Sequence, residues 1–133
     1  QGTSAEGSTQ AAAEPTGARV LGLEISLADS FAFFEQGKPF LDARTLKEFN
    51  EGRVMNAVHA PTDEFSRKLG ELMMFRDETV IVYCGGGACD ASHNLAILLE
   101  SAGFKSIHIM VDGYPAWVNA GHPTEGSSSP EGR

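Results

Sequence analysis

The chain has 133 residues, a hydrophobic fraction of 41% and a formal net charge of −8. This length fits a single domain. The acidic balance argues against nucleic acid and against an anionic membrane surface as partners, because both require a basic face. Two cysteines are too few for a disulfide scaffold, and no apolar run approaches the ~20 residues needed to span a bilayer.

The two ends of the chain differ in composition from its middle. Residues 1–19 and 125–133 are rich in small and polar residues and lack apolar periodicity, so we expect flexible tails around a folded unit of residues 20–124. The chain starts at Gln1 and shows no signal peptide, and we interpret it as a soluble processed or excised fragment. Its compartment stays open: the full-length chain is either cytoplasmic, or exported or membrane-tethered.

Strands and helices alternate through the first half of the folded unit. After a short strand, Leu27, Phe31 and Phe34 follow helical spacing, and Gly37 is the expected stop. A later helix should begin at Thr45, because Glu48 three residues on completes a capping-box pattern. The other elements expected here are strands at 39–43 and 56–61 and a helix at 62–75, and Gly52 should end the helix that Thr45 begins.

The same alternation continues in the second half. Residues 78–84 form a run of β-branched residues typical of a buried strand. A helix over 91–104 should follow, closed by Gly103. Its apolar stripe is expected to consist of Ala91, Leu95, Leu98 and Ala102. A strand at 105–113 and a short helix at 114–121, closed by Gly121, complete the pattern.

This pattern predicts an α/β fold with a mainly parallel sheet. Ligands of such sheets bind outside the carboxyl ends of the strands. Cys84 lies at that end of the most apolar strand, and glycines at 85–87 follow it. Glycines allow successive N–H groups to point at one centre, and a helix N-terminus adds to the attraction for an anion.

The thiol of Cys84 is the group that such a cradle would ionise. A free thiol has a pKa near ~8.5, and a helix N-terminus lowers it to about 3.5–7.5. Cys84 is then an exposed thiolate and a nucleophile. The alternative, a buried strand-end cysteine beside an ordinary glycine turn, stays open on the residues alone.

Several separated segments resemble the rhodanese-like domain family in the right order. "FLDARTLKEFNEGRVMNAVHAP" is similar to the family's Asp-x-Arg strand, its Glu-Phe helix and the turn into Pro. "VYCGGG" is similar to its catalytic strand and loop, and "AGFKSIHIMVDGYPAW" to its closing segment. The resemblance covers nearly all of residues 23–123 and implies a doubly wound fold with a five-stranded sheet.

The resemblance also implies a chemistry. Cys84 would take up sulfane sulfur as a persulfide and pass it to a thiol or another nucleophile. The loop of Gly85, Gly86, Gly87, Ala88, Cys89 and Asp90 would bind the anionic sulfur through its N–H groups. No metal and no organic cofactor is implied. The expected partners are a small sulfane-sulfur donor or persulfide and a thiol or protein acceptor.

The loop departs from the family pattern Cys-x-x-Gly-x-Arg-Ser. Gly87 holds the Gly position, but Cys89 stands where the Arg is expected, and Ser92 comes two residues late. Segment 85–92 contains no Arg or Lys, so we expect inefficient turnover of the thiosulfate dianion. The loop is two residues longer than in the family pattern, so we expect a wider pocket, suited to a bulkier donor. The missing Arg also argues against a phosphatase. Arg53 near the mouth is a candidate to supply the charge.

Cys89 has three interpretations at this stage. It is a small filler at the base of the loop, a resolving thiol that attacks the Cys84 persulfide or forms a disulfide with Cys84, or a metal ligand together with Cys84 and His93. The resolving role motivates a second hypothesis for the whole domain, a non-turnover redox or sulfur-sensing interaction module that uses the Cys84/Cys89 pair.

The other notable residues are expected to be structural. Asp42 and Arg44 match the family's Asp-x-Arg and should brace the sheet edge near the loop, and Arg44 is also spaced to pair with Glu48. Asp112 and Gly113 should shape a loop on the same rim as Cys84. Trp117 is a core candidate. The isolated histidines are expected at the surface or satisfied in the core: His59, His108 and His122.

Overall fold

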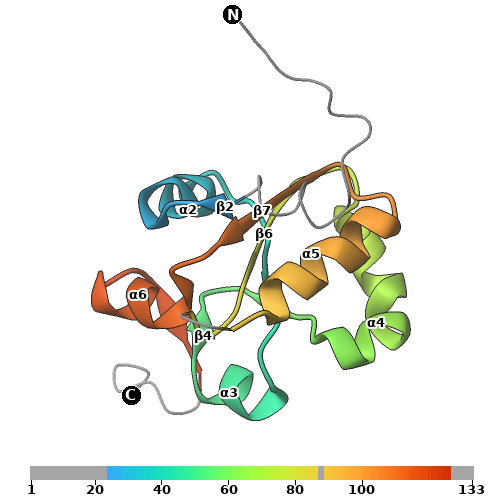
Figure 1. The fold of residues 1–133 in the computed structure, drawn as a ribbon. Coiled ribbons are helices and arrows are strands. Elements are labelled where there is room, and N and C mark those ends of the chain that lie inside the picture. The colour runs from blue at the N-terminus through green and yellow to red at the C-terminus, as the bar shows by residue number, and fades with distance from the viewer. Residues whose placement is uncertain (1–23, 87–88, 127–133) are drawn as a thin grey trace, which may run out of the picture.

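The computed structural model describes residues 24–86 and 89–126. Its centre is a five-stranded sheet in which every neighbouring pair is parallel, in the order β2-β7-β6-β3-β5 (Figure 1). The strands are β2 Glu24–Ile25, β3 Phe40–Asp42, β5 Val58–His59, β6 Thr79–Tyr83 and β7 Ser106–Met110. The predicted fold class, a mainly parallel five-stranded sheet flanked by helices, is confirmed.

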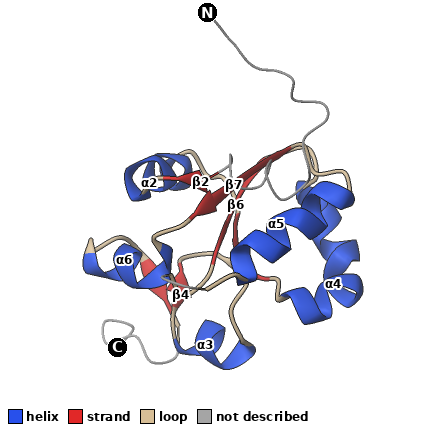
Figure 2. Cartoon of the chain, viewed as in Figure 1, coloured by secondary structure: helices blue, strands red, loops and turns tan. Residues whose placement is uncertain are grey.

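Helices cover both faces of this sheet (Figure 2). Against one face lie α4 and α5, and against the other lie α2 and α6 (Figure 1). The helices are α2 Leu27–Glu35, α3 Leu46–Glu51, η2 Thr62–Glu64, α4 Phe65–Leu72, η3 Met73–Phe75, α5 Ala91–Ser101 and α6 Gly113–Asn119. Among the described residues, no helix is long and apolar enough to cross a bilayer.

Strand β6 feeds the cores on both faces, because successive side chains of a strand point to opposite sides. Val80 and Val82 pack with Cys84 in the cluster under α4 and α5. Ile81 and Tyr83 pack in the other cluster, around Trp117. Every side chain from Val80 to Tyr83 is fully buried. The predicted buried strand is therefore confirmed, and it sets Cys84 on the α5 side of the sheet.

Most predicted helix ends are confirmed. The Thr45 side chain accepts from the Glu48 backbone N–H, and the Glu48 side chain accepts in return from Thr45, so the capping box is formed. Gly37, Gly103 and Gly121 all have positive φ directly after the C-caps of α2, α5 and α6. This conformation favours glycine.

Two sequence predictions need correction here. The buried face of α5 consists of Ser92, Leu95, Ala96 and Leu99, whereas Ala91, Leu98 and Ala102 are half-buried. The predicted stripe does pack against this core, but Leu95 is its only fully buried member, and the buried face extends to Ser92, Ala96 and Leu99. Glu125, assigned to the C-terminal tail, is part of β8 Thr124–Glu125, which pairs antiparallel with β4 Arg53–Val54. Residues 1–19 lie outside the described part of the chain.

Candidate active site: a cysteine pair at the carboxyl edge

Cys84 follows β6 directly and is 3% exposed. It forms a disulfide with Cys89, and the two Cα atoms lie 6.5 Å apart. The Cys89 backbone N–H donates to the Gly86 carbonyl at 3.2 Å, so the chain turns back on itself and brings the second sulfur to the first. The expectation of an exposed Cys84 thiolate is not met in this state, because the bonded partner and the α5 core cover the sulfur.

The start of α5 supplies polar groups next to the sulfur. Ser92 is 2% exposed, and its Oγ lies 3.5 Å from Cys84 Sγ. A disulfide sulfur carries no proton, so the Ser92 hydroxyl is the donor in this contact. Asp90 is the N-cap residue but makes no capping hydrogen bond with its side chain. Because α5 begins at Ala91, directly after the cysteine loop, the positive end of its dipole lies on the cysteine side, where it favours a thiolate.

The glycines that follow Cys84 have separate roles. Gly86 has φ +82°, and a Cβ atom there would lie 2.7 Å from the Asp112 carbonyl oxygen. Gly113 has φ +77°, and a Cβ atom on it would overlap the backbone of Gly86. Gly85, by contrast, has open space around it. Gly87 and Ala88, which the sequence analysis placed in the anion-binding loop, lie outside the described residues.

A hydrogen bond ties this loop to the loop before α6. The Tyr114 backbone N–H donates to the Cys84 carbonyl at 2.9 Å. Together with the Gly86–Gly113 contact, it fixes the 84–86 segment against the 112–114 segment. The expectation that Asp112 and Gly113 border the same rim as Cys84 is thus met.

A buried ion pair occupies the adjacent strand end. Arg44 donates to both carboxylate oxygens of Asp42, at 3.0 Å from Nε and 2.7 Å from the terminal nitrogen. The Tyr83 hydroxyl also donates to Asp42, at 2.8 Å, and accepts from the Val54 N–H. The same Arg44 nitrogen reaches the Gly52 carbonyl at 2.5 Å. The bracing role predicted for Asp42 and Arg44 agrees with this network, whereas Glu48, the other predicted partner of Arg44, bonds to Thr45.

The network favours the charged form of Arg44 and the neutral form of Tyr83. Burial alone would lower the pKa of Arg44, but the hydrogen bond and the negative charge of Asp42 outweigh it and raise that pKa. Burial, reinforced by the Asp42 charge, raises the pKa of Tyr83 far above its ordinary value. The Arg44 guanidinium also lies 4.3 Å from the centre of the Tyr114 ring. Arg44 is therefore held in the scaffold by its contacts with Asp42, Gly52 and Tyr114.

Arg53 and His93 have other partners in the structure than those considered from the sequence. Arg53 donates to Glu125 at 3.2 Å and to the Phe49 carbonyl at 3.0 Å, so its cation serves the β4–β8 corner and not the cysteine loop. His93 Nε2 lies 2.7 Å from a Glu24 carboxylate oxygen. The metal-ligand alternative for Cys84, Cys89 and His93 is therefore not assembled here, and within the described residues no group of three ligating side chains could hold a metal.

The remaining histidines and Trp117 have structural partners. His59 is buried and donates from Nε2 to the Arg44 carbonyl at 2.8 Å. Trp117 is fully buried and donates to the Pro123 carbonyl. His108 stacks on Phe33, and His122 stacks on Phe31. The expectation of satisfied structural residues agrees with the hydrogen bonds of His59 and Trp117, whereas His108 Nδ1 is buried without a hydrogen-bond partner among the described residues.

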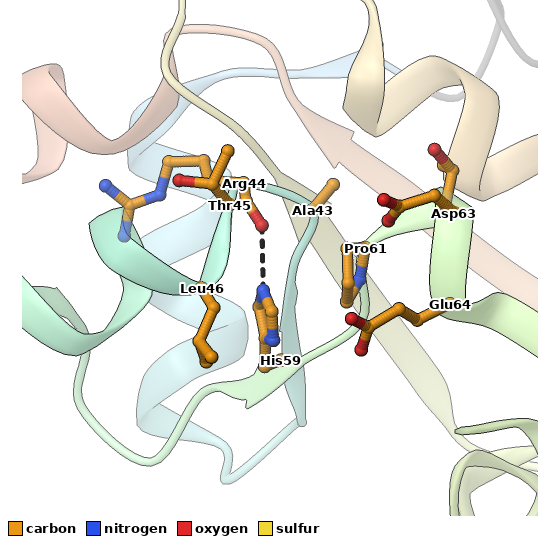
Figure 3. Close-up of a pocket in the computed structure, with 9 residues that line it drawn as sticks. Ala43, Arg44, Thr45, Leu46, His59, Pro61, Asp63 and Glu64 are labelled. Carbon is orange, nitrogen blue, oxygen red and sulfur yellow. Dashed lines mark hydrogen bonds between the residues drawn. The ribbon is translucent and has the colours of Figure 1, made fainter. Parts of the chain in front are cut away.

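A pocket of about 190 Å³ lies on the same sheet edge, beyond β3. Figure 3 shows the side chains around it, with His59 bonded to the Arg44 carbonyl on one side and Asp63 and Glu64 on the other. Its wall includes the exposed Leu46. None of its lining residues comes from the cysteine loop, so it is a neighbour of the cysteine site and not its floor.

The fold and the cysteine at the carboxyl end of its central strand define the class: an open parallel α/β domain with a sulfur-based site. The chain belongs to the rhodanese-like domain family, whose model matches residues 31–120. It is 31% identical over 85 residues to the thiosulfate sulfurtransferase GlpE of Glaesserella parasuis, covering 64% of this chain and 75% of that protein. The family resemblance of the sequence is thus confirmed.

Two further matches are a transcriptional regulator and a solved structure. An HTH-type transcriptional regulator of Mycobacterium tuberculosis is 28% identical over 85 residues, and the match spans 64% of this chain but only 36% of the regulator. Among solved structures, the rhodanese-like domain of an Anabaena protein is 26% identical, with a TM-score of 0.67 and coverage of 80% of each chain.

Sequence reasoning missed the tyrosines of the site. Tyr83 completes the Asp42 network, and Tyr114 both stacks on Arg44 and bonds the Cys84 carbonyl. A tyrosine inside an apolar run looks like ordinary core, so nothing in the Tyr83 segment marks its hydroxyl. Tyr114 directly follows Gly113, which was expected on the same rim as Cys84, and this adjacency was the signal that could have placed Tyr114 near the site.

Proposed function

We propose that this domain is a sulfurtransferase that carries sulfane sulfur as a persulfide on Cys84 and passes it to a thiol or another nucleophile. The observation that carries the proposal is the position of Cys84, at the carboxyl end of the central strand and facing the start of α5. A relative named as a thiosulfate sulfurtransferase supports it. In the reduced protein, the α5 dipole and the Ser92 hydroxyl would stabilise the thiolate and the persulfide anion.

The donor is proposed to be a persulfide in preference to thiosulfate. Segment 85–92 contains no Lys or Arg, and Asp90 within it and Asp112 beside it are exposed. Arg44 and Arg53, the cations considered for this edge, are held by Asp42 and Glu125. A thiosulfate dianion would thus be bound by N–H donors against nearby negative charge, which weakens binding.

The test is sulfur uptake by the fully reduced protein. Cys89→Ser, which keeps Cys84 but cannot form the disulfide, and Cys84→Ser are incubated with glutathione persulfide, 3-mercaptopyruvate or thiosulfate, and the peptides are mapped by mass. We expect one added sulfur on the Cys84 peptide with the persulfide, little with thiosulfate, and none in Cys84→Ser. Full sulfur transfer by Cys84→Ser would exclude the proposal.

The disulfide favours a second candidate, a redox or sulfur-sensing module that binds a partner protein without turnover. It shares the cysteine pair but predicts no catalytic cycle. Repeated turnover of donor under reducing conditions would rule it out. A single oxidation event without further sulfur transfer would support it over the sulfurtransferase.

A further inference from the structure

We propose that Cys89 is a catalytic resolving thiol that releases the sulfur carried by Cys84 as hydrosulfide. The inference rests on the proposed persulfide chemistry and adds its product and its requirement for a reductant. The juxtaposition that carries it is the bond between the two sulfurs, made by a loop that also returns the Cys89 N–H to the Gly86 carbonyl.

The geometry selects which sulfur Cys89 attacks. A persulfide on Cys84 has an inner sulfur, Sγ itself, and an outer sulfur that came from the donor. The loop brings Cys89 to Cys84 Sγ, so the attack that needs no rearrangement is on the inner sulfur. The Cys89 thiolate then forms the Cys84–Cys89 bond, the bond from Cys84 Sγ to the outer sulfur breaks, and HS⁻ leaves with the electron pair.

This step balances without an external oxidant. The sulfane sulfur is reduced to sulfide, and the two cysteine sulfurs are oxidised to the disulfide. The proton of the Cys89 thiol goes to solvent or to the leaving hydrosulfide. The described structure is the product state of this step, and it cannot accept another sulfur because Cys84 has no free thiolate.

A dithiol reductant completes the cycle, and the difference in burial between the two cysteines determines which sulfur the reductant attacks. Cys84 is 3% exposed, whereas Cys89 is only half-buried. An incoming thiolate therefore attacks Cys89, and Cys84 leaves as a thiolate next to the Ser92 hydroxyl and the start of α5. The second thiol of the reductant then frees Cys89, leaving both cysteines reduced.

The position of Cys89 also explains a missing residue. It stands where the family pattern has a loop arginine. A cation there would help bind an anionic donor, whereas a thiol there can discharge the persulfide. The exchange of one for the other fits a domain that discharges its persulfide as hydrosulfide when no external acceptor takes the sulfur.

The decisive experiment uses reduced, desalted protein and one equivalent of glutathione persulfide. Wild type should release about one equivalent of sulfide and become two hydrogens lighter than the reduced form. Cys89→Ser should stay one sulfur heavier and release at least about tenfold less sulfide, because it lacks the intramolecular attack. Cys84→Ser should do neither.

The outcomes separate this inference from the proposed function. If Cys89→Ser takes up no sulfur, the persulfide chemistry itself fails. If Cys89→Ser is loaded and wild type stays equally loaded without sulfide release, only the resolving role is overturned. If the added sulfur moves to Cys89 in wild type, the attack is on the outer sulfur and the inner-sulfur mechanism is wrong.

A second measurement tests the direction of reduction. The oxidised wild type is treated briefly with a monothiol, quenched with acid and mapped. The mixed disulfide should lie on Cys89, the more accessible sulfur. An adduct found mainly on Cys84 would overturn the proposed direction.

Discussion

Two neighbouring strands end on the same edge of the sheet, and their ends are built in opposite ways. At the end of β3, Asp42 and Arg44 form a buried ion pair, and the Tyr83 hydroxyl donates a further hydrogen bond to the same carboxylate. At the end of β6, the loop after Cys84 has no cation and is held by backbone contacts and one disulfide. The end of β3 stabilises the scaffold, whereas at the end of β6 the sulfur of Cys84 is held by a disulfide that thiol exchange can open.

The largest expected effect comes from breaking the ion pair. Asp42→Ala leaves the Arg44 guanidinium buried without its counter-charge, which should lower the free energy of unfolding by about 3–5 kcal/mol. The measurement is denaturant unfolding under reducing conditions, so that the disulfide does not contribute.

The matched control for that variant is an exposed ion pair. Lys47 and Glu51 have side chains 81% and 51% exposed, so Lys47→Ala should leave the free energy of unfolding almost unchanged. A similar loss in both variants would show that the buried network has no special role in stability.

A smaller effect is expected from the cysteine loop itself. Gly86→Ala places a Cβ against the Asp112 carbonyl at positive φ and should cost about 1–2 kcal/mol or more. It should also slow closure of the Cys84–Cys89 disulfide, measured by timed alkylation after addition of a mild oxidant. Gly85→Ala, with open space around it, should leave both stability and closure unchanged; a slowed closure there would argue that any loop substitution has this effect.

The cap of α3 tests how far the β3 edge depends on its flanking helix. Thr45→Ala removes the side-chain oxygen that accepts from the Glu48 N–H and should lower the free energy of unfolding by about 1 kcal/mol. Ser66→Ala, at an exposed position of α4, should change it by less than about 0.5 kcal/mol. Thermal unfolding of both variants under reducing conditions provides the comparison, and an unaltered Thr45→Ala protein would mean that packing alone holds α3.

The smallest effect on stability and the most specific effect on chemistry should come from Ser92→Ala. Loss of the hydroxyl removes a donor to the Cys84 thiolate, which destabilises the reduced form. The reduction potential should fall by about 20 mV for a lost hydrogen bond of ~1 kcal/mol. A dithiothreitol redox titration measures it, with Ser101→Ala as the exposed control, and an equal potential in both would remove Ser92 from the site.

Much of the frame was readable from sequence. The run of β-branched residues before Cys84 indicated the central strand, and glycines after apolar helices indicated their ends. These signals are strong because they are local and repeat with a fixed period. The placement of Asp42 and Arg44 beside the site followed from the family resemblance.

The parts that were missed depend on contacts between distant segments. Strands β4 and β8 have two residues each and carry no periodicity, so the pairing of Glu125 with Arg53 left no pattern to read. The same pairing removed Arg53 from the cysteine loop. The burial of Cys84 and its bond to Cys89 depend on how one turn closes, which the sequence left open among three alternatives.

The backbone contact between Gly86 and Gly113 limits how this site can be exchanged between relatives. Neither glycine can accept a side chain without displacing the other segment, and Tyr114 is bonded to the Cys84 carbonyl as well. A chimaera that receives only a foreign segment 84–92 would inherit a mismatched neighbour. The transplantable unit is the pair of segments 84–92 and 112–114, which are distant in the chain but must be replaced together.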